Sequence, residues 1–163
     1  MEQLYLEADY VIDTSNMSLS ALSKELKKIY GSDPAGEKNI TINISAFGFK
    51  YGLPLDSDLV FDVRCFPNPF YVDDLKEKTG LDPEVREYVM KFDESKEFMK
   101  KLEDMIKFLL PLYIEEGKTS LSIAVGCTGG KHRSVTMAFL LGEFLEKKGY
   151  HVNMVYRDIE KGR

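Results

Sequence analysis

One segment of this chain constrains its fold more than any other. It is the glycine-rich stretch Gly126-Cys127-Thr128-Gly129-Gly130-Lys131-His132-Arg133-Ser134. An apolar run over residues 121–125 precedes it and a helical pattern over residues 135–148 follows it, which predicts a strand, a tight loop and a helix. In that order the backbone N–H groups of the loop converge at the positive end of the helix dipole. We expect an anion such as phosphate or sulfate to bind there, with Arg133 adding a pair of hydrogen bonds.

The spacing of Cys127, Arg133 and Ser134 also matches the signature of cysteine phosphatases, in which a thiolate attacks phosphorus. A helix N-terminus and neighbouring cations stabilise a thiolate, so this chemistry is physically reasonable. Asp58 or Asp62 would then supply the general acid. Two alternatives stay open. Cys127 packs as a small residue at a tight turn, and each aspartate is an ordinary turn or cap residue.

Composition limits the class of protein. The chain has 163 residues, the length of one domain, and no apolar stretch approaches the roughly 20 residues that span a bilayer. We therefore expect a soluble, cytoplasmic protein with no membrane partner. Its two cysteines, Cys65 and Cys127, are too few for a disulfide framework or a zinc quartet, so we predict no metal and no cofactor. The net charge of −5 argues against a surface devoted to nucleic acid, although a local basic patch stays possible.

Hydrophobic periodicity predicts strands that alternate with helices. We expect strands over residues 8–13, 40–44, 59–64, 121–125 and 152–156, and helices over 19–29, 81–88, 95–112 and 135–148. Ser18 is the predicted N-cap of the first helix, and Gly31 and Gly149 are predicted helix stops. The alternation predicts a single three-layer α/β domain, with a mostly parallel sheet and helices on both faces.

Ligands of parallel sheets bind at the carboxyl ends of the strands. Three predicted loops meet at that edge: residues 45–54 with Lys50, residues 64–69 with Arg64 and Asn68, and residues 126–134 with Arg133. Three cations at one edge suit an anionic ligand. In the alternative interpretation, Arg64 pairs with Asp58 or Asp62. The aromatic residues nearby either stack on a base or sugar or form core and pocket wall; they are Tyr51, Phe66, Phe70 and Tyr71.

Four motifs together resemble the C-terminal domain of the RapZ/YvcJ family. They lie at residues 47–52, at 58–64 with 67–69, at 79–82 and at 126–134, and the resemblance runs from about residue 6 to residue 161. It implies a fold similar to a phosphofructokinase subdomain and identifies residues 1–163 as an isolated C-terminal domain. Family members bind and hydrolyse ATP or GTP through an N-terminal Walker A domain. This chain has no G-x-x-x-x-G-K-[ST] sequence, so that activity does not reside here.

The resemblance also implies a function. RapZ-type members sense glucosamine-6-phosphate, bind small RNAs and present them to an endoribonuclease, and we expect a homo-oligomer. Transferred by position, the ligand pocket comprises Lys50, Arg64, Asn68, Cys127, Thr128, Gly129, Gly130, His132, Arg133 and Ser134. The RNA-contacting cations correspond to Arg157, Lys161 and Arg163.

Two departures from the RapZ pattern weaken the RNA interpretation. The basic C-terminal run of that branch is reduced here to residues 160–163, and Tyr51 replaces a histidine. We therefore favour a regulatory domain that binds a phosphorylated metabolite without turnover. A phosphatase built on Cys127 and Arg133 is the alternative.

Overall fold

The structure, a computed structural model, describes residues 8–30 and 40–161. The chain divides into two compact units, Met1–Glu37 and Lys38–Arg163. In the first unit α2 spans Leu19–Tyr30, and the Ala21 N–H donates to the Ser18 Oγ at 3.2 Å, so the predicted helix and its cap are confirmed. Gly31 lies outside the described residues.

The strand predicted over residues 8–13 is wrong. None of these residues belongs to the described sheet, and the Asp13 carboxylate accepts the Ser15 N–H at 3.0 Å in a turn. A six-residue segment with three consecutive apolar residues, Tyr10, Val11 and Ile12, is too weak a signal by itself, because a strand is stable only when a neighbouring strand satisfies its backbone.

The second unit contains a four-stranded parallel sheet in the order β2-β3-β1-β4. Its strands are β1 (Thr41–Gly48), β2 (Leu59–Asp62), β3 (Ser120–Cys127) and β4 (His151–Tyr156). The α/β class and the parallel sheet predicted from the sequence are confirmed. β1 is longer than predicted because Ala46 and Phe47 are buried and stay paired with β3, so the loop begins only at Phe49.

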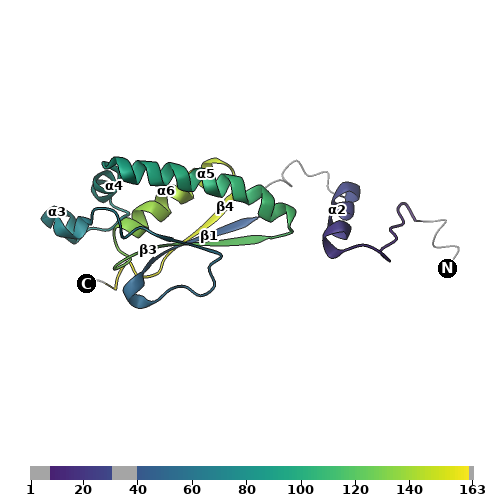
Figure 1. The fold of residues 1–163 in the computed structure, drawn as a ribbon, viewed down its shortest axis with the longest axis horizontal. Helices are drawn as coiled ribbons and strands as arrows, with labels where there is room; N and C mark the ends of the chain where they lie inside the picture. Colours follow the sequence, from purple (N-terminus) through teal and green to yellow (C-terminus); the bar gives the residue numbers. More distant parts are fainter. Residues whose placement is uncertain (1–7, 31–39, 162–163) are drawn as a thin grey trace. The chain divides into compact units, whose positions relative to one another are not determined.

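The helices of this unit are α3 (Asp73–Lys76), α4 (Pro83–Met90), α5 (Asp93–Glu115) and α6 (Arg133–Lys147). In Figure 1, α4, α5 and α6 lie on one side of the sheet, and the connection from β1 to β2 runs on the other. The sequence predicts helices on both faces; in the described part of this unit, the second face carries the short 3-10 helix η2 (Phe49–Tyr51). No helix in the described ranges is long and apolar enough to cross a membrane.

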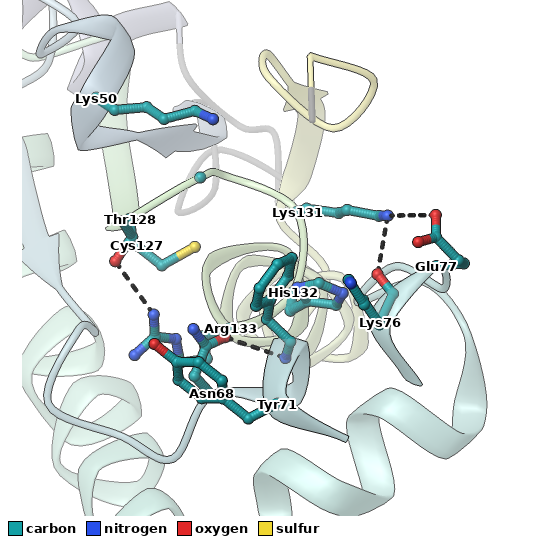
Figure 2. Close-up of a pocket in the computed structure, with 12 residues that line it drawn as sticks. Lys50, Asn68, Tyr71, Lys76, Glu77, Cys127, Thr128, Lys131, His132 and Arg133 are labelled. Carbon is teal, nitrogen blue, oxygen red and sulfur yellow. Dashed lines mark hydrogen bonds and ion pairs between the residues drawn. The ribbon is translucent and has the colours of Figure 1, made fainter. Parts of the chain in front are cut away.

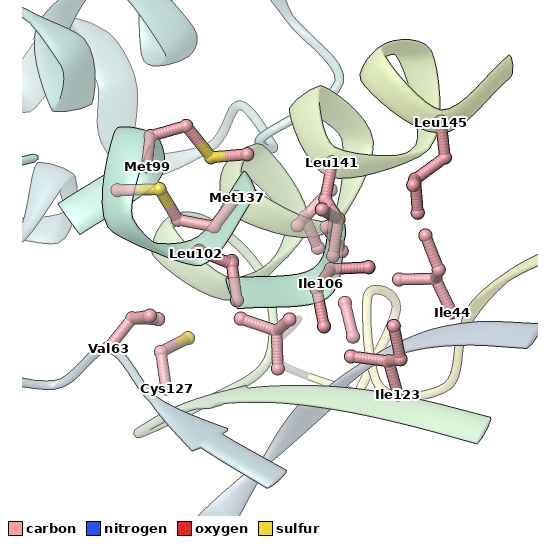
Figure 3. Close-up of a cluster of buried hydrophobic side chains, with 14 of the residues drawn as sticks. Ile44, Val63, Met99, Leu102, Ile106, Ile123, Cys127, Met137, Leu141 and Leu145 are labelled. Carbon is pink, nitrogen blue, oxygen red and sulfur yellow. The ribbon is translucent and has the colours of Figure 1, made fainter. Parts of the chain in front are cut away.

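The core lies between the sheet and these helices. Ile44 and Ile123 of the sheet pack in one cluster with Ile106 of α5 and Leu141 of α6, all fully buried (Figure 3). The opposite face of β1 is polar as far as Ser45, and Asn43 donates to the Ser120 Oγ at 3.0 Å. This one-sided core fixes the register that aligns Gly48 of β1 with Cys127 of β3 and Asp62 of β2 with Gly126. Three strand ends thus meet at one edge.

Candidate anion-binding site

A pocket of about 500 Å³ opens at this carboxyl edge (Figure 2). Its walls come from η2, from the segment after β2 that contains the 3-10 helix η3 (Pro69–Tyr71), from α3, and from the loop between β3 and α6. We call that last loop, residues 126–134, the anion loop. The lining residues are Lys50, Asn68, Phe70, Tyr71, Lys76, Glu77, Cys127, Thr128, Gly129, Lys131, His132 and Arg133.

The anion loop is tightly folded against β1. Gly130 has φ +75°, in the left-handed region that favours glycine. A Cβ added there would lie 2.7 Å from the Gly48 nitrogen and 2.9 Å from the Asp158 Cβ. The Gly130 N–H donates to the Cys127 Sγ at 3.2 Å, which closes the loop over the end of β3. Only glycine satisfies both the backbone angle and the close approach.

The loop leaves backbone donors available. Within the described residues, no acceptor takes the N–H groups of Gly129, Lys131 and His132. Arg133, which follows directly, is the first residue of α6, so these donors stand at the positive end of a 15-residue helix. Such a group of N–H donors is a ready site for an anion.

Arg133 joins the loop to the segment after β2. Its side chain is almost fully buried, and Nη1 donates to the carbonyls of Arg64 at 2.7 Å and Phe66 at 2.8 Å. Nη2 donates to the Thr128 Oγ1 at 3.3 Å, while Nε has no partner within the described residues. The guanidinium therefore holds the anion loop to the segment after β2, and its Nε–H remains available as a hydrogen-bond donor.

His132 is 6% exposed, and its Nε2 has no partner among the residues described. Burial lowers the pKa of this imidazole, and the positive charge of Lys131 lowers it further. The side chain is therefore neutral at pH 7. A buried ring nitrogen without a partner beside a pocket is a polar group that a ligand can satisfy.

Cations outnumber acids around the pocket. Lys50, Lys76, Lys131 and Arg133 line it, against the single carboxylate of Glu77. The Lys131 ammonium donates to the Lys76 carbonyl at 3.0 Å and lies 3.9 Å from Glu77 (Figure 2). In a chain of net charge −5, this local excess of positive charge favours an anionic ligand.

One known protein family matches most of this chain. A model of the RapZ C-terminal domain matches residues 40–160. The chain belongs to the RapZ C-terminal domain family. The pocket and the sheet edge that forms it lie entirely within the matched residues.

This RapZ-type domain also occurs in relatives that are longer than this chain. A nucleotide-binding protein of Caldicellulosiruptor bescii is 57% identical over 161 residues, which cover 99% of this chain and 55% of the relative. A nucleotide-binding protein of Thermoanaerobacter sp. is 59% identical over 152 residues, 93% of this chain and 53% of the relative. One from Clostridium novyi is 48% identical over 161 residues, 99% of this chain and 55% of the relative. The chain spans about half the length of the curated relatives it matches.

The structure brings most of the predicted ligand residues of this RapZ-type domain together. Those that line the pocket are Lys50, Asn68, Cys127, Thr128, Gly129, His132 and Arg133. Gly130 and Ser134 lie behind them, and the Ser134 Oγ is 3.1 Å from the Cys127 Sγ. Asn68 also caps η3, because its side chain accepts the Phe70 N–H at 3.3 Å.

Arg64 does not line the pocket. Its guanidinium forms an ion pair with Asp62 at 2.6 Å and lies over the Phe49 ring, 3.9 Å from the centroid. The alternative in which Arg64 pairs with Asp62 therefore describes its position. Hydrogen bonds from Arg64 lower the pKa of the Asp62 carboxyl, so that group is ionised and occupied.

The position of Asp58 argues against the predicted role as general acid. Its carboxylate accepts the Ser122 N–H at 2.8 Å and pairs with Lys118 at 2.7 Å. Ser122 precedes Cys127 by five residues of β3, about 16 Å at about 3.3 Å per residue. Asp58 precedes β2 at the amino edge of the sheet, so its carboxylate does not reach the Cys127 thiol at the carboxyl edge.

Two of the cations predicted to contact RNA have partners inside the domain. Arg157 and Lys161 both pair with the buried carboxylate of Asp158, at 2.7 and 2.8 Å. Arg163 lies outside the described residues. Sequence reasoning missed Asp158 and also the pocket residues Lys76 and Glu77, because α3 has only four residues and shows no periodicity.

Proposed function

We propose that this domain is a regulatory site that binds a phosphorylated metabolite of the sugar-phosphate class, such as glucosamine-6-phosphate. One observation carries the proposal: the unpaired backbone donors of the anion loop and four cationic side chains belong to residues that line the same pocket. A phosphate group accepts several hydrogen bonds at once and prefers such a site. The exposed ring of Tyr71 offers an apolar surface for the rest of the ligand.

The family supports a regulatory output for this binding. The resemblance to RapZ implies a coupling to small RNA or to an endoribonuclease, and we propose that this domain takes part in such a coupling. The relatives are named nucleotide-binding proteins. Because this chain has no G-x-x-x-x-G-K-[ST] sequence, we place ATP or GTP binding outside this pocket.

Calorimetric titration with inorganic phosphate and a panel of sugar phosphates tests the proposal. Lys50→Ala and Lys76→Ala each remove a pocket cation without touching the core, and each should weaken binding about tenfold or more. Lys100→Ala, an exposed lysine on α5, is the matched control and should bind like the wild-type protein. Equal affinity in all four proteins would place the ligand elsewhere.

A second function, a cysteine phosphatase, rests on a separate observation. The Cys127 Sγ receives the Gly130 N–H at 3.2 Å and lies 3.1 Å from the Ser134 hydroxyl, so the sulfur is held in place beside the pocket that Cys127 lines. Neither aspartate is well placed as the general acid of this reaction. Asp58 pairs with Lys118 far from Cys127, and Asp62 pairs with Arg64. Phosphate release from a sugar phosphate that disappears in Cys127→Ser would establish the enzyme; binding without release supports the regulatory site.

A further inference from the structure

A buried ion cluster lies directly behind the pocket. The Asp158 carboxylate is 0% exposed and accepts the Gly48 N–H at 2.8 Å. It also pairs with Arg157 at 2.7 Å and Lys161 at 2.8 Å. Burial alone would raise the pKa of Asp158, but these hydrogen bonds and charges lower it to about 2. The cluster is therefore charged at neutral pH and holds the turn after β4 to the end of β1.

The same turn, residues 157–161, holds η2 at its far end. The Tyr51 Oη donates to the Lys161 carbonyl at 2.6 Å, and the Arg157 Nη2 donates to the Gly52 carbonyl at 2.7 Å. The Lys161 ammonium also lies over the Tyr51 ring, 5.1 Å from its centroid. η2 is therefore attached at its last residue, Tyr51, and at the residue that follows it, Gly52. We call residues 157–161 the C-terminal turn.

These attachments act on pocket residues. Lys50 belongs to η2, lines the pocket and has its ammonium 4.7 Å from the Tyr51 ring centroid. Its backbone N–H donates to the Thr128 carbonyl of the anion loop at 3.3 Å. Gly130 of that loop is so close to Gly48 and Asp158 that no Cβ fits between them. The C-terminal turn thus supports both Lys50 and the anion loop from behind.

We infer that Tyr51 and the C-terminal turn are positioning residues of this pocket, which hold Lys50 in reach of the bound phosphate. The inference rests on the proposed function, because it concerns the same pocket. Binding free energies are reciprocal, so an occupied pocket also stabilises the C-terminal turn. A site formed by residues 47–52 and 126–134 is therefore coupled to the last described residues of the chain.

A double-mutant cycle tests the inference. Asp158→Asn leaves two cations without a buried partner and can prevent folding, so the cycle uses Tyr51→Phe, which removes only the bond to Lys161. Tyr51→Phe should weaken binding of inorganic phosphate about two- to tenfold. In the Lys50→Ala background the same change should have little further effect, because Tyr51 acts through Lys50. A general loss of structure would not give this dependence on Lys50.

Tyr88→Phe on α4, outside the pocket, is the matched control and should bind phosphate like the wild-type protein. Thermal unfolding of each variant checks that the fold is intact. Suppose that wild-type protein binds phosphate. If Tyr51→Phe then binds it equally well, or if the effect of Tyr51→Phe adds fully to that of Lys50→Ala, the inference fails while the proposed function stands. If wild-type protein binds neither inorganic phosphate nor a sugar phosphate, the proposed function fails and the inference fails with it.

Discussion

At the scale of single residues, Gly130 and Gly129 are neighbours with opposite requirements. Gly130 has φ +75° and no room for a methyl group, whereas a Cβ on Gly129 would meet nothing within 4 Å. A non-glycine residue in the left-handed region strains the backbone, and the contact with Gly48 adds to that strain. The anion loop therefore depends on one of its two adjacent glycines.

Gly130→Ala should lower the free energy of unfolding by about 1–3 kcal/mol and abolish phosphate binding. Gly129→Ala, on the next residue, should change stability by less than about 1 kcal/mol. Urea unfolding monitored by circular dichroism measures both variants. Equal stability of the two would show that the loop does not need this conformation.

The buried imidazole of His132 gives anion binding a pH dependence. Its pKa is below the ordinary value in the free protein, so the ring is neutral at pH 7. A bound dianion favours the imidazolium, which raises the pKa of His132 in the complex, and affinity must then increase as the pH falls. Sulfate is a suitable probe because it stays a dianion while phosphate titrates.

Calorimetry should show tighter sulfate binding at about pH 5.5 than at about pH 7.5, with proton uptake on binding. In His132→Gln, which retains a polar side chain, this pH dependence should largely disappear. A wild-type affinity for sulfate that does not change with pH would exclude His132 from contact with the anion.

At the scale of elements, the strongly patterned segments were predictable. β3, the anion loop and α6 follow from an apolar run, clustered glycines and helical periodicity, and that order also indicated where the pocket lies. α3 and η3 were missed because elements of three or four residues show no periodicity. Lys76 and Glu77 were missed with them. The positions of Asp58 and Asp158 depend on partners distant in sequence, Lys118 and Gly48, which no local pattern indicates, whereas Arg64 pairs with Asp62 two residues away.

α5 provides a test of the one-sided core within a single helix. Leu110 is fully buried against the sheet and α6, whereas Leu112 is 48% exposed. Leu110→Ala should therefore destabilise the domain by about 2–5 kcal/mol, because it removes buried methyl groups and leaves a cavity. Leu112→Ala should cost less than about 1 kcal/mol in the same urea titration. Equal losses would contradict the assigned face of α5.

At the scale of the whole molecule, the site belongs to one of the two compact units. All pocket residues, the C-terminal turn and the family match at residues 40–160 fall within Lys38–Arg163. A protein of residues 38–163 should therefore fold and bind phosphate with the affinity of the full chain, as measured by calorimetry. Loss of binding in that shorter protein, with its fold intact, would mean that residues 1–37 contribute to the site.

The most direct test of the central claim is an NMR titration of the ¹⁵N-labelled chain with a sugar phosphate. The backbone amide signals of Gly129, Lys131 and His132 should show the largest shifts and should saturate, because their N–H groups receive the phosphate oxygens. The signals of α5 should stay nearly unchanged. Saturable shifts confined to other surfaces, or no shifts at millimolar ligand, would contradict the claim that the anion loop binds a phosphorylated metabolite.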